Sequence, residues 1–172
     1  MTRFTVLVGA PQPRSATYDA AVLAAGALAE AAGIRPADRV IDLAEFGAGL
    51  LAPEPEPGLA EALRAVSASD FVLIATPAAQ GTYTGLLKVF VDRLPELGLG
   101  GALALPLAVT ADPRHAFGIE SDLRALLAEL GAYVPADGLV LGAAELADAA
   151  APVLAWARAV APDVKPLMLS AA

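Results

Sequence analysis

The residues best suited to chemistry gather in three short polar segments, each of which follows an apolar, β-rich run. These segments are residues 9–17 (GAPQPRSAT), 76–84 (TPAAQGTYT) and 110–115 (TADPRH). They supply hydroxyl, amide and guanidinium groups, which suit the binding of an anionic or planar ligand. The chain has no cysteine and one histidine. This excludes disulfides, thiol catalysis and a multi-histidine metal site within one chain.

The first segment joins an apolar run to a helical pattern. Ser15 and Thr17 stand where a side-chain oxygen caps the helix N-terminus. The same hydroxyls, the free helical N–H groups and Arg14 also make a cradle for a phosphate group. Helix capping alone explains the residues equally well. The segment is neither a Walker sequence nor a GxGxxG motif.

The second segment combines polar and small side chains. Gln80 and Thr82 are polar, whereas the small residues would let a ligand approach the main chain closely; these are Ala78, Ala79 and Gly81. We therefore expect a backbone-lined shelf for a planar ring. The alternative is a simple strand-to-helix turn in which Thr84 is the helix N-cap.

The third segment contains Asp112-Pro113, a turn-forming pair, and ends at the lone His115. Such a histidine is more often a surface or capping residue than a catalytic one. No nucleophile-elbow sequence is present, so we expect no Ser–His–Asp triad.

The elements that would position these segments alternate between strand and helix. Strands are predicted at 4–8, 39–43, 71–75, 102–110 and 133–141, although Pro106 is awkward in the fourth. Helices are predicted at 16–32 (ending at Gly33), 59–68, the segment after Thr84, 119–130 and 145–160, with a tail at 162–172. This alternation predicts an α/β, flavodoxin-like three-layer sandwich in one domain spanning 1–172. Its five-stranded parallel sheet would have the order 2-1-3-4-5, with all three segments on one rim.

Composition narrows the function classes. The 172 residues are 57% apolar and 17% charged, which argues against disorder. The net charge of −8 disfavours nucleic acid and anionic membranes as partners. Uncharged runs such as 97–111 are all shorter than the ~20 residues that span a bilayer. With no targeting signal visible, we expect a cytoplasmic protein.

Taken together, the segments resemble the NADPH-dependent FMN reductase family, especially the flavin reductases that supply alkanesulfonate monooxygenases. The strongest match is TPAAQGTYTGLLKVFVDRLPE at 76–96. The stretch from LPLAVT at 105–110 to RHAFGIESDLRALLAELGA at 114–132 supports it. The resemblance runs from about residue 4 to residue 141.

The resemblance implies an NAD(P)H-dependent FMN reductase with FMN and NADPH as cofactors. It places the FMN phosphate in 9–17, the isoalloxazine ring along 77–82, and the ring's pyrimidine edge at 110–112. It also implies a homodimer or homotetramer packed through the helix of Lys88 and Asp92, a pair whose spacing itself predicts an ion pair. The candidate cofactor-binding residues are Arg14, Ser15, Thr17, Pro77, Ala78, Ala79, Gln80, Thr82, Thr110, Ala111, Asp112 and His115.

The chain departs from the family pattern at four places: Ala10 replaces a serine, Gln12 an arginine, Ala78-Ala79 a Val-Tyr pair, and Ala111-Asp112 a Gly-Gly pair. Two hypotheses follow. The first is a flavin reductase that feeds a partner monooxygenase or reduces quinone-like acceptors. The second is a flavodoxin-fold subunit that has lost flavin and acts as a structural or binding partner. No residue selects NADPH over NADH.

Overall fold

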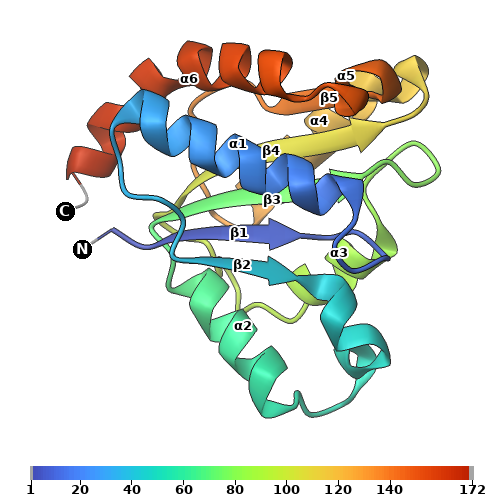
Figure 1. Cartoon of the computed structure of the whole chain (residues 1–172). Helices are drawn as coiled ribbons and strands as arrows, with labels where there is room; N and C mark the ends of the chain where they lie inside the picture. Colours follow the sequence, from blue (N-terminus) through green and yellow to red (C-terminus); the bar gives the residue numbers. More distant parts are fainter. Residues whose placement is uncertain (1, 171–172) are drawn as a thin grey trace.

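A five-stranded parallel sheet in the order β2-β1-β3-β4-β5 forms the centre of the molecule (Figure 1). The structure is a computed structural model that describes residues 2–170, without the side chains of 113, 115–117, 169 and 170. The strands are β1 (Phe4–Val8), β2 (Arg39–Asp42), β3 (Phe71–Pro77), β4 (Leu103–Thr110) and β5 (Leu139–Gly142). The predicted flavodoxin-like order is confirmed.

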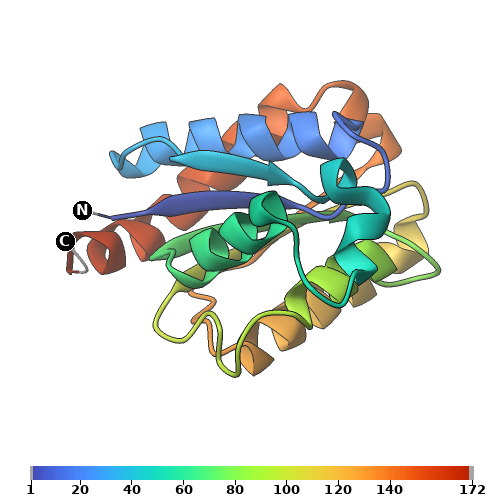
Figure 2. The same cartoon turned by 90° about the horizontal axis from the view of Figure 1, so that it is seen from below.

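Helices cover both faces of this sheet (Figures 1 and 2). They are α1 (Ala16–Ala32), the 3₁₀ segment η1 (Leu43–Leu51), α2 (Pro57–Ser67), α3 (Gly85–Val91), α4 (Pro113–Glu129), α5 (Ala143–Ala147) and α6 (Ala150–Ser170). On one face, α1 and α6 pack on Val6, Val8 and Leu73. On the other, η1, α2, α3 and α4 pack on Leu7 and Ile74. Because successive strand residues point to opposite faces, continuous apolar strands serve both layers.

Helix α1 shows why the sequence folds this way. Its alanines give it a smooth inner face that lies close to the sheet, and Ala20, Ala21 and Ala24 are buried there. Ser15 caps its start by accepting a hydrogen bond from the Tyr18 N–H. Gly33 ends it with a left-handed φ of 64°, a conformation in which glycine costs least.

Pro106 fits inside β4 because the strand is not continuously paired on the β5 side. Towards β3 the ladder runs through the whole of β4, and Ile74 is the partner of Pro106. Towards β5 the ladder begins only at Leu107, while an earlier bridge joins Leu103 to Tyr133. Pro106 lies between these two stretches, where a missing N–H is tolerated.

Three expected boundaries are wrong. Helix α4 begins at Pro113, six residues before the expected 119, because Asp112 caps it and proline suits a first helical position. The last strand is only Leu139–Gly142, and Tyr133 makes an isolated bridge. The expected helix 145–160 is two helices, and α6 continues through Pro162 and Pro166 instead of ending in a tail. Burial of Ala161, Val164 and Met168 against the core holds this helix together.

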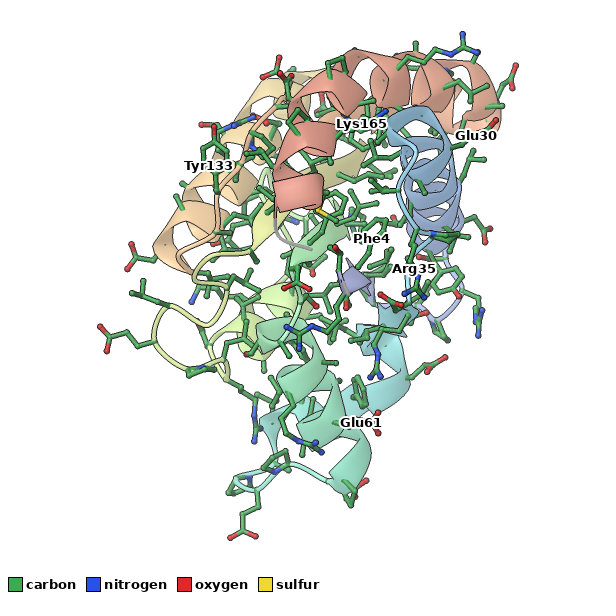
Figure 3. The ribbon with its side chains drawn as sticks, turned by 90° about the vertical axis from the view of Figure 1, so that its left-hand side faces the viewer. Phe4, Glu30, Arg35, Glu61, Tyr133 and Lys165 are labelled. Atoms are coloured by element: carbon green, nitrogen blue, oxygen red, sulfur yellow. The ribbon has the colours of Figure 1, made fainter. Side chains whose placement is uncertain are left out.

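The two edges of the sheet differ in character. Figure 3 looks onto the amino edge, where Phe4 and Arg35 lie. There the Phe4 and Phe71 rings stack with centroids 4.4 Å apart. The three polar segments leave from the opposite, carboxyl edge. Within the described residues, no helix combines the length and apolarity needed to cross a bilayer.

Candidate functional site

Hydrogen bonds join the first two polar segments at the carboxyl edge. The Gly9 N–H donates to the Ala75 carbonyl at 2.7 Å, which continues the β1–β3 ladder beyond its end. The Thr84 hydroxyl donates to the Gly9 carbonyl at 2.6 Å. A Cβ on residue 9 would lie 2.7 Å from the Leu87 Cβ. Glycine is therefore required at position 9 by the close approach of α3.

The second segment is in turn bound to β4 and to the helix that follows it, α4. The Ala78 N–H donates to the Val109 carbonyl at 2.7 Å. The Thr82 hydroxyl donates to a carboxylate oxygen of Asp122, on α4, at 2.6 Å. All three polar segments thus form one connected rim, as predicted.

The first segment presents the start of α1. The Ser15 hydroxyl oxygen accepts from the Tyr18 N–H at 3.2 Å, so it caps the helix. Thr17 is only 3% exposed, and its hydroxyl makes no hydrogen bond to any residue that the structure describes. Among all the residues that the structure describes, Ser67 Oγ is the one side-chain polar atom that is fully enclosed and has no hydrogen-bond partner, so the Thr17 oxygen is not fully enclosed. The Thr17 hydroxyl therefore faces an opening to solvent.

Arg14 was expected to contribute its guanidinium to a phosphate cradle, but its contacts in the structure are with other residues. Its backbone has a φ of 52°, which is unusual for a residue with a side chain. Its guanidinium lies 4.6 Å from the centre of the Tyr18 ring and donates to the Tyr18 hydroxyl at 2.6 Å. Its N–H donates to the Asp42 carboxylate at 2.9 Å. The sequence reading missed Asp42, whose only signal was its place at the end of a predicted strand.

The second segment is a tight hairpin rather than a featureless turn. Ala79 and Thr82 exchange backbone hydrogen bonds of 2.7 and 3.2 Å. Between them, Gln80 and Gly81 have φ values of 50° and 90°, the pattern of a two-residue hairpin turn. The backbone of Pro77, Ala78 and Ala79 leads up to this turn and is half-buried. The turn therefore gives a fixed, small-residue ledge at the rim.

The third segment is the beginning of a helix, which corrects its expected form as an open loop. Asp112 is the N-cap of α4 and accepts from the Arg114 N–H at 2.9 Å. Thr110 is buried, and its hydroxyl donates to the Asp112 carbonyl at 2.9 Å. Ala111 is exposed between them. His115 falls in the first turn of α4, and its side chain lies outside the described residues.

Charge at this third segment is paired locally. The Asp112 carboxylate accepts two hydrogen bonds from the Arg114 Nε, at 3.0 and 2.9 Å. This side-chain hydrogen bonding raises the pKa of Arg114 above its ordinary value. On α3, Lys88 and Asp92 form the expected ion pair. Their hydrogen bond raises the pKa of Lys88.

No group of three or more His, Asp or Glu side chains within the described residues is arranged to hold a metal ion. The rim offers backbone N–H groups, two hydroxyls at the start of α1, and a ledge of small residues. Such groups bind a phosphate and a flat ring.

The sequence of this chain is similar to those of known FMN reductases. The chain is 30% identical to the NADH-dependent FMN reductase SfnE of Pseudomonas putida over 125 residues, 70% of this chain and 66% of that protein. It is 33% identical to an FMN reductase (NADPH) of Escherichia coli over 76 residues, 44% of this chain and 40% of that protein. These matches therefore span between two fifths and two thirds of the relatives' length.

A solved structure of an NADH:FMN oxidoreductase (EmoB) in its apo form superposes with a TM-score of 0.83 at 26% identity, covering 99% of this chain and 90% of that one. The family described as NADPH-dependent FMN reductase matches residues 2–160. This chain belongs to the NADPH-dependent FMN reductase family.

Proposed function

We propose that this chain is an NAD(P)H-dependent FMN reductase with its flavin site at the carboxyl rim. The FMN phosphate binds at the start of α1, between Ser15, Thr17 and the first helical N–H groups. The isoalloxazine ring lies along residues 77–82, and its pyrimidine edge meets residues 110–112. The observation that carries the proposal is the Thr17 hydroxyl, which is 3% exposed and unpaired within the described residues.

The residues at the rim fit FMN. A phosphate oxygen supplies the acceptor that the Thr17 hydroxyl and the N-terminal N–H groups of α1 otherwise take from water. A flat ring needs main chain that it can approach, and Pro77, Ala78 and Ala79 present only small side chains. The N–H groups of Ala78 and Ala79 are already paired with backbone carbonyls, so the ring rests on this ledge by van der Waals contact.

Two departures from the family pattern do not obstruct the site. Ala10 is 1% exposed and packs in the core between α1 and the sheet, so it presents no side chain to a ligand. The carboxylate of Asp112 is engaged by Arg114 and by the start of α4. Its charge is therefore partly balanced before any flavin approaches.

The protein's part in the reaction is to bind and to orient. Bound FMN supplies the hydride-accepting chemistry, so no side chain needs to act as acid or base. The Thr84–Gly9 and Thr82–Asp122 hydrogen bonds fix the two segments that hold the two ends of the flavin. The hairpin 79–82 keeps the ring ledge in place, and the proposal requires the other face of the ring to stay open to nicotinamide.

The choice of nicotinamide nucleotide and the final electron acceptor are two further parts of the proposal. The relatives' names include both NADPH and NADH, and we propose NADPH as the donor on the family description. We propose that the reduced flavin leaves for a partner monooxygenase, because two family positions in residues 9–17 are replaced, at Ala10 and Gln12, and this would loosen the flavin. Reduction of quinone-like acceptors is the variant. We place the protein in the cytoplasm as a homodimer or homotetramer.

One titration tests the function. FMN is added to purified protein while flavin fluorescence is followed, and NADPH or NADH is then added without oxygen. Loss of the oxidised-flavin absorbance at catalytic protein levels supports the reductase. Absence of FMN binding at millimolar concentration would favour a subunit that has lost flavin. The sequence feature behind that alternative is Ala78-Ala79, where the family's aromatic residue is missing.

A further inference from the structure

The first polar segment contains a backbone conformation that its sequence does not favour. Arg14 has a φ of 52°, in the left-handed region where a Cβ is crowded by the following carbonyl. It directly precedes Ser15, the cap of α1. The direction in which the chain enters α1 therefore depends on a conformation that something else must hold.

Asp42 is the residue that holds it. Its side chain is 3% exposed at the end of β2, the strand next to β1. One carboxylate oxygen accepts from the Arg14 N–H at 2.9 Å, and the other accepts from the Ala44 N–H at 3.2 Å. A buried carboxylate requires such donors, and the hydrogen bond from the Arg14 N–H holds this part of the first segment against the end of β2.

The guanidinium of Arg14, by contrast, is occupied elsewhere. It stacks on the Tyr18 ring and donates to the Tyr18 hydroxyl, one turn along α1. Arg14 can therefore affect the start of α1 through its backbone without its side chain touching a ligand there.

We propose that Asp42 is a positioning residue for flavin binding: it locks Arg14 in the left-handed conformation and so presents Ser15, Thr17 and the N–H groups of α1 to the phosphate. The Arg14 guanidinium is not a phosphate ligand. This inference rests on the proposed function. It adds the residue that shapes the phosphate site and reassigns the role of Arg14.

Asp42→Asn is the first test, since it keeps the size of the side chain but turns one acceptor oxygen into an NH₂ group. We expect the FMN dissociation constant, measured by fluorescence quenching, to rise about 10- to 100-fold, the value of one hydrogen bond to a charged group. Riboflavin, which has no phosphate, should lose less than about threefold. A purely structural role would weaken both flavins alike and would overturn the proposal.

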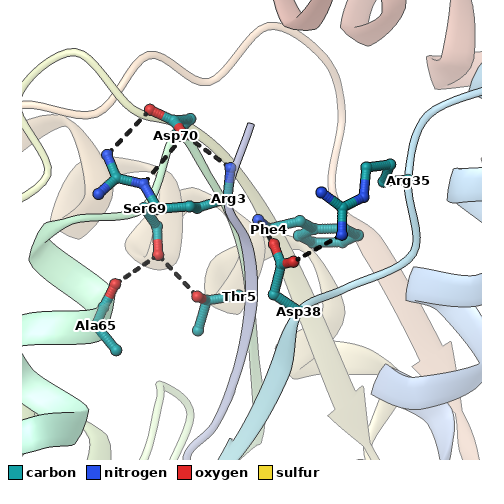
Figure 4. Close-up of polar contacts among 8 residues, drawn as sticks. All are labelled: Arg3, Phe4, Thr5, Arg35, Asp38, Ala65, Ser69 and Asp70. Atoms are coloured by element: carbon teal, nitrogen blue, oxygen red, sulfur yellow. Dashed lines mark hydrogen bonds and ion pairs between the residues drawn. The ribbon is translucent and has the colours of Figure 1, made fainter. Parts of the chain in front are cut away.

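Asp38→Asn is the matched control. Asp38 also accepts a backbone hydrogen bond through its carboxylate, from the Phe4 N–H at 2.8 Å, but at the opposite edge of the sheet (Figure 4). Weakening this hydrogen bond should lower the melting temperature and leave the ratio of FMN to riboflavin affinity unchanged. An equal change in that ratio would show that the effect of Asp42 is a general one.

A second pair of variants separates backbone from side chain even if Asp42→Asn folds poorly. Arg14→Gly and Arg14→Ala both remove the exposed guanidinium, but only glycine adopts the left-handed conformation freely. We expect Arg14→Gly to bind FMN within about threefold of the wild type and Arg14→Ala to bind about tenfold more weakly. Equal losses would make the guanidinium a phosphate ligand and overturn the proposal. A wild-type chain that binds no FMN would overturn the proposed function as well.

Discussion

The Thr84 hydroxyl donates a hydrogen bond of 2.6 Å to the carbonyl of Gly9, a residue 75 positions away in the sequence. The same oxygen accepts from the Leu87 N–H at 3.1 Å and so caps α3. The Thr84 N–H donates to the Thr76 hydroxyl at 3.2 Å. A single 3%-exposed threonine therefore ties the first polar segment, the second polar segment and α3 together.

Replacing this threonine should loosen all three. Thr84→Val keeps the shape but leaves the Gly9 carbonyl and the Leu87 N–H without their partner. We expect the free energy of unfolding to fall by roughly 2–3 kcal/mol, the sum of a lost cap and a buried unpaired group. Urea unfolding measures the loss, and Thr84→Ser, which keeps the hydroxyl, should recover most of it. If serine behaved like valine, packing of the methyl group would be the cause instead.

The close approach of α3 to the first segment gives a second prediction. In Gly9→Ala, the new Cβ would lie 2.7 Å from the Leu87 Cβ, so the backbone must shift. We expect a loss of about 1–3 kcal/mol in stability, as for other overpacked sites. Gly26→Ala is the control: nothing lies within 4 Å of its new Cβ, and it is exposed on α1. That variant should gain about 0.5–1 kcal/mol, because alanine favours the helix.

Much of the fold could be predicted from the sequence, because local preferences for strand, helix and turn agreed with the packing of the parallel sheet. The run Phe4–Val8 is buried on every residue and apolar on all but Thr5, as suits a strand covered on both faces, and Gly9 then ends it. Ser15 and Gly33 mark the two ends of α1 as expected. Since parallel strands release their loops at one edge, the three polar segments had to meet.

The wrong boundaries arose where tertiary packing outweighed local preference. Pro162 and Pro166 should end a helix, yet α6 continues because its inner side chains are buried against the core. Asp112-Pro113 was expected to form a turn but caps a helix. The role of Asp42 could not be predicted, since its partner, the Arg14 N–H, is 28 residues distant and a backbone donor has no sequence signature.

The amino edge supplies a pH-dependent contribution to stability. Partial burial raises the pKa of Asp70, but the hydrogen bonds from the Arg3 backbone and side chain outweigh this, so its pKa is lowered overall. The Arg3 N–H lies 2.7 Å from the Asp70 carboxylate (Figure 4). A lowered folded-state pKa means that the stabilisation is complete above the unfolded value of about 3.9 and disappears as pH falls through the folded value.

Asp70→Asn should therefore lower the melting temperature at about pH 7, because the charged acceptor is lost. The difference from the wild type should shrink towards pH 2, where Asp70 in the wild type is protonated too. Thermal melts at a series of pH values measure it. A difference that stayed constant over this range would mean that the side chain contributes through packing and not through its charge.

The hydrogen bond between Thr82 and Asp122 predicts that FMN and riboflavin lose affinity equally when it is broken. It anchors the ring ledge to α4, whereas the proposed phosphate cradle lies at the start of α1. Asp122→Ala should therefore weaken FMN and riboflavin by the same factor, about three- to tenfold for one exposed hydrogen bond. Asp122→Asn, which can still accept from Thr82, should stay near the wild type. A loss confined to FMN would place Asp122 in the phosphate site.

Thr17 offers the sharpest separation between binding and stability. Because its hydroxyl makes no hydrogen bond within the described residues, Thr17→Val should change the free energy of unfolding by less than about 0.5 kcal/mol. The same change should weaken FMN about tenfold, one hydrogen bond to phosphate, and leave riboflavin unaffected. Fluorescence titration and urea unfolding on the same preparation measure both.

Thr5→Val is its counterpart at the other edge of the sheet. Thr5 is also 3% exposed, but its hydroxyl accepts from the Ser69 hydroxyl at 2.8 Å (Figure 4). That variant should lose about 0.5–1.5 kcal/mol of stability, because the Ser69 hydroxyl loses this partner and keeps only the Ala65 carbonyl, and should keep its FMN affinity. If Thr17→Val instead destabilised the protein and bound FMN normally, the hydroxyl would be a structural group, and the phosphate would have to bind elsewhere.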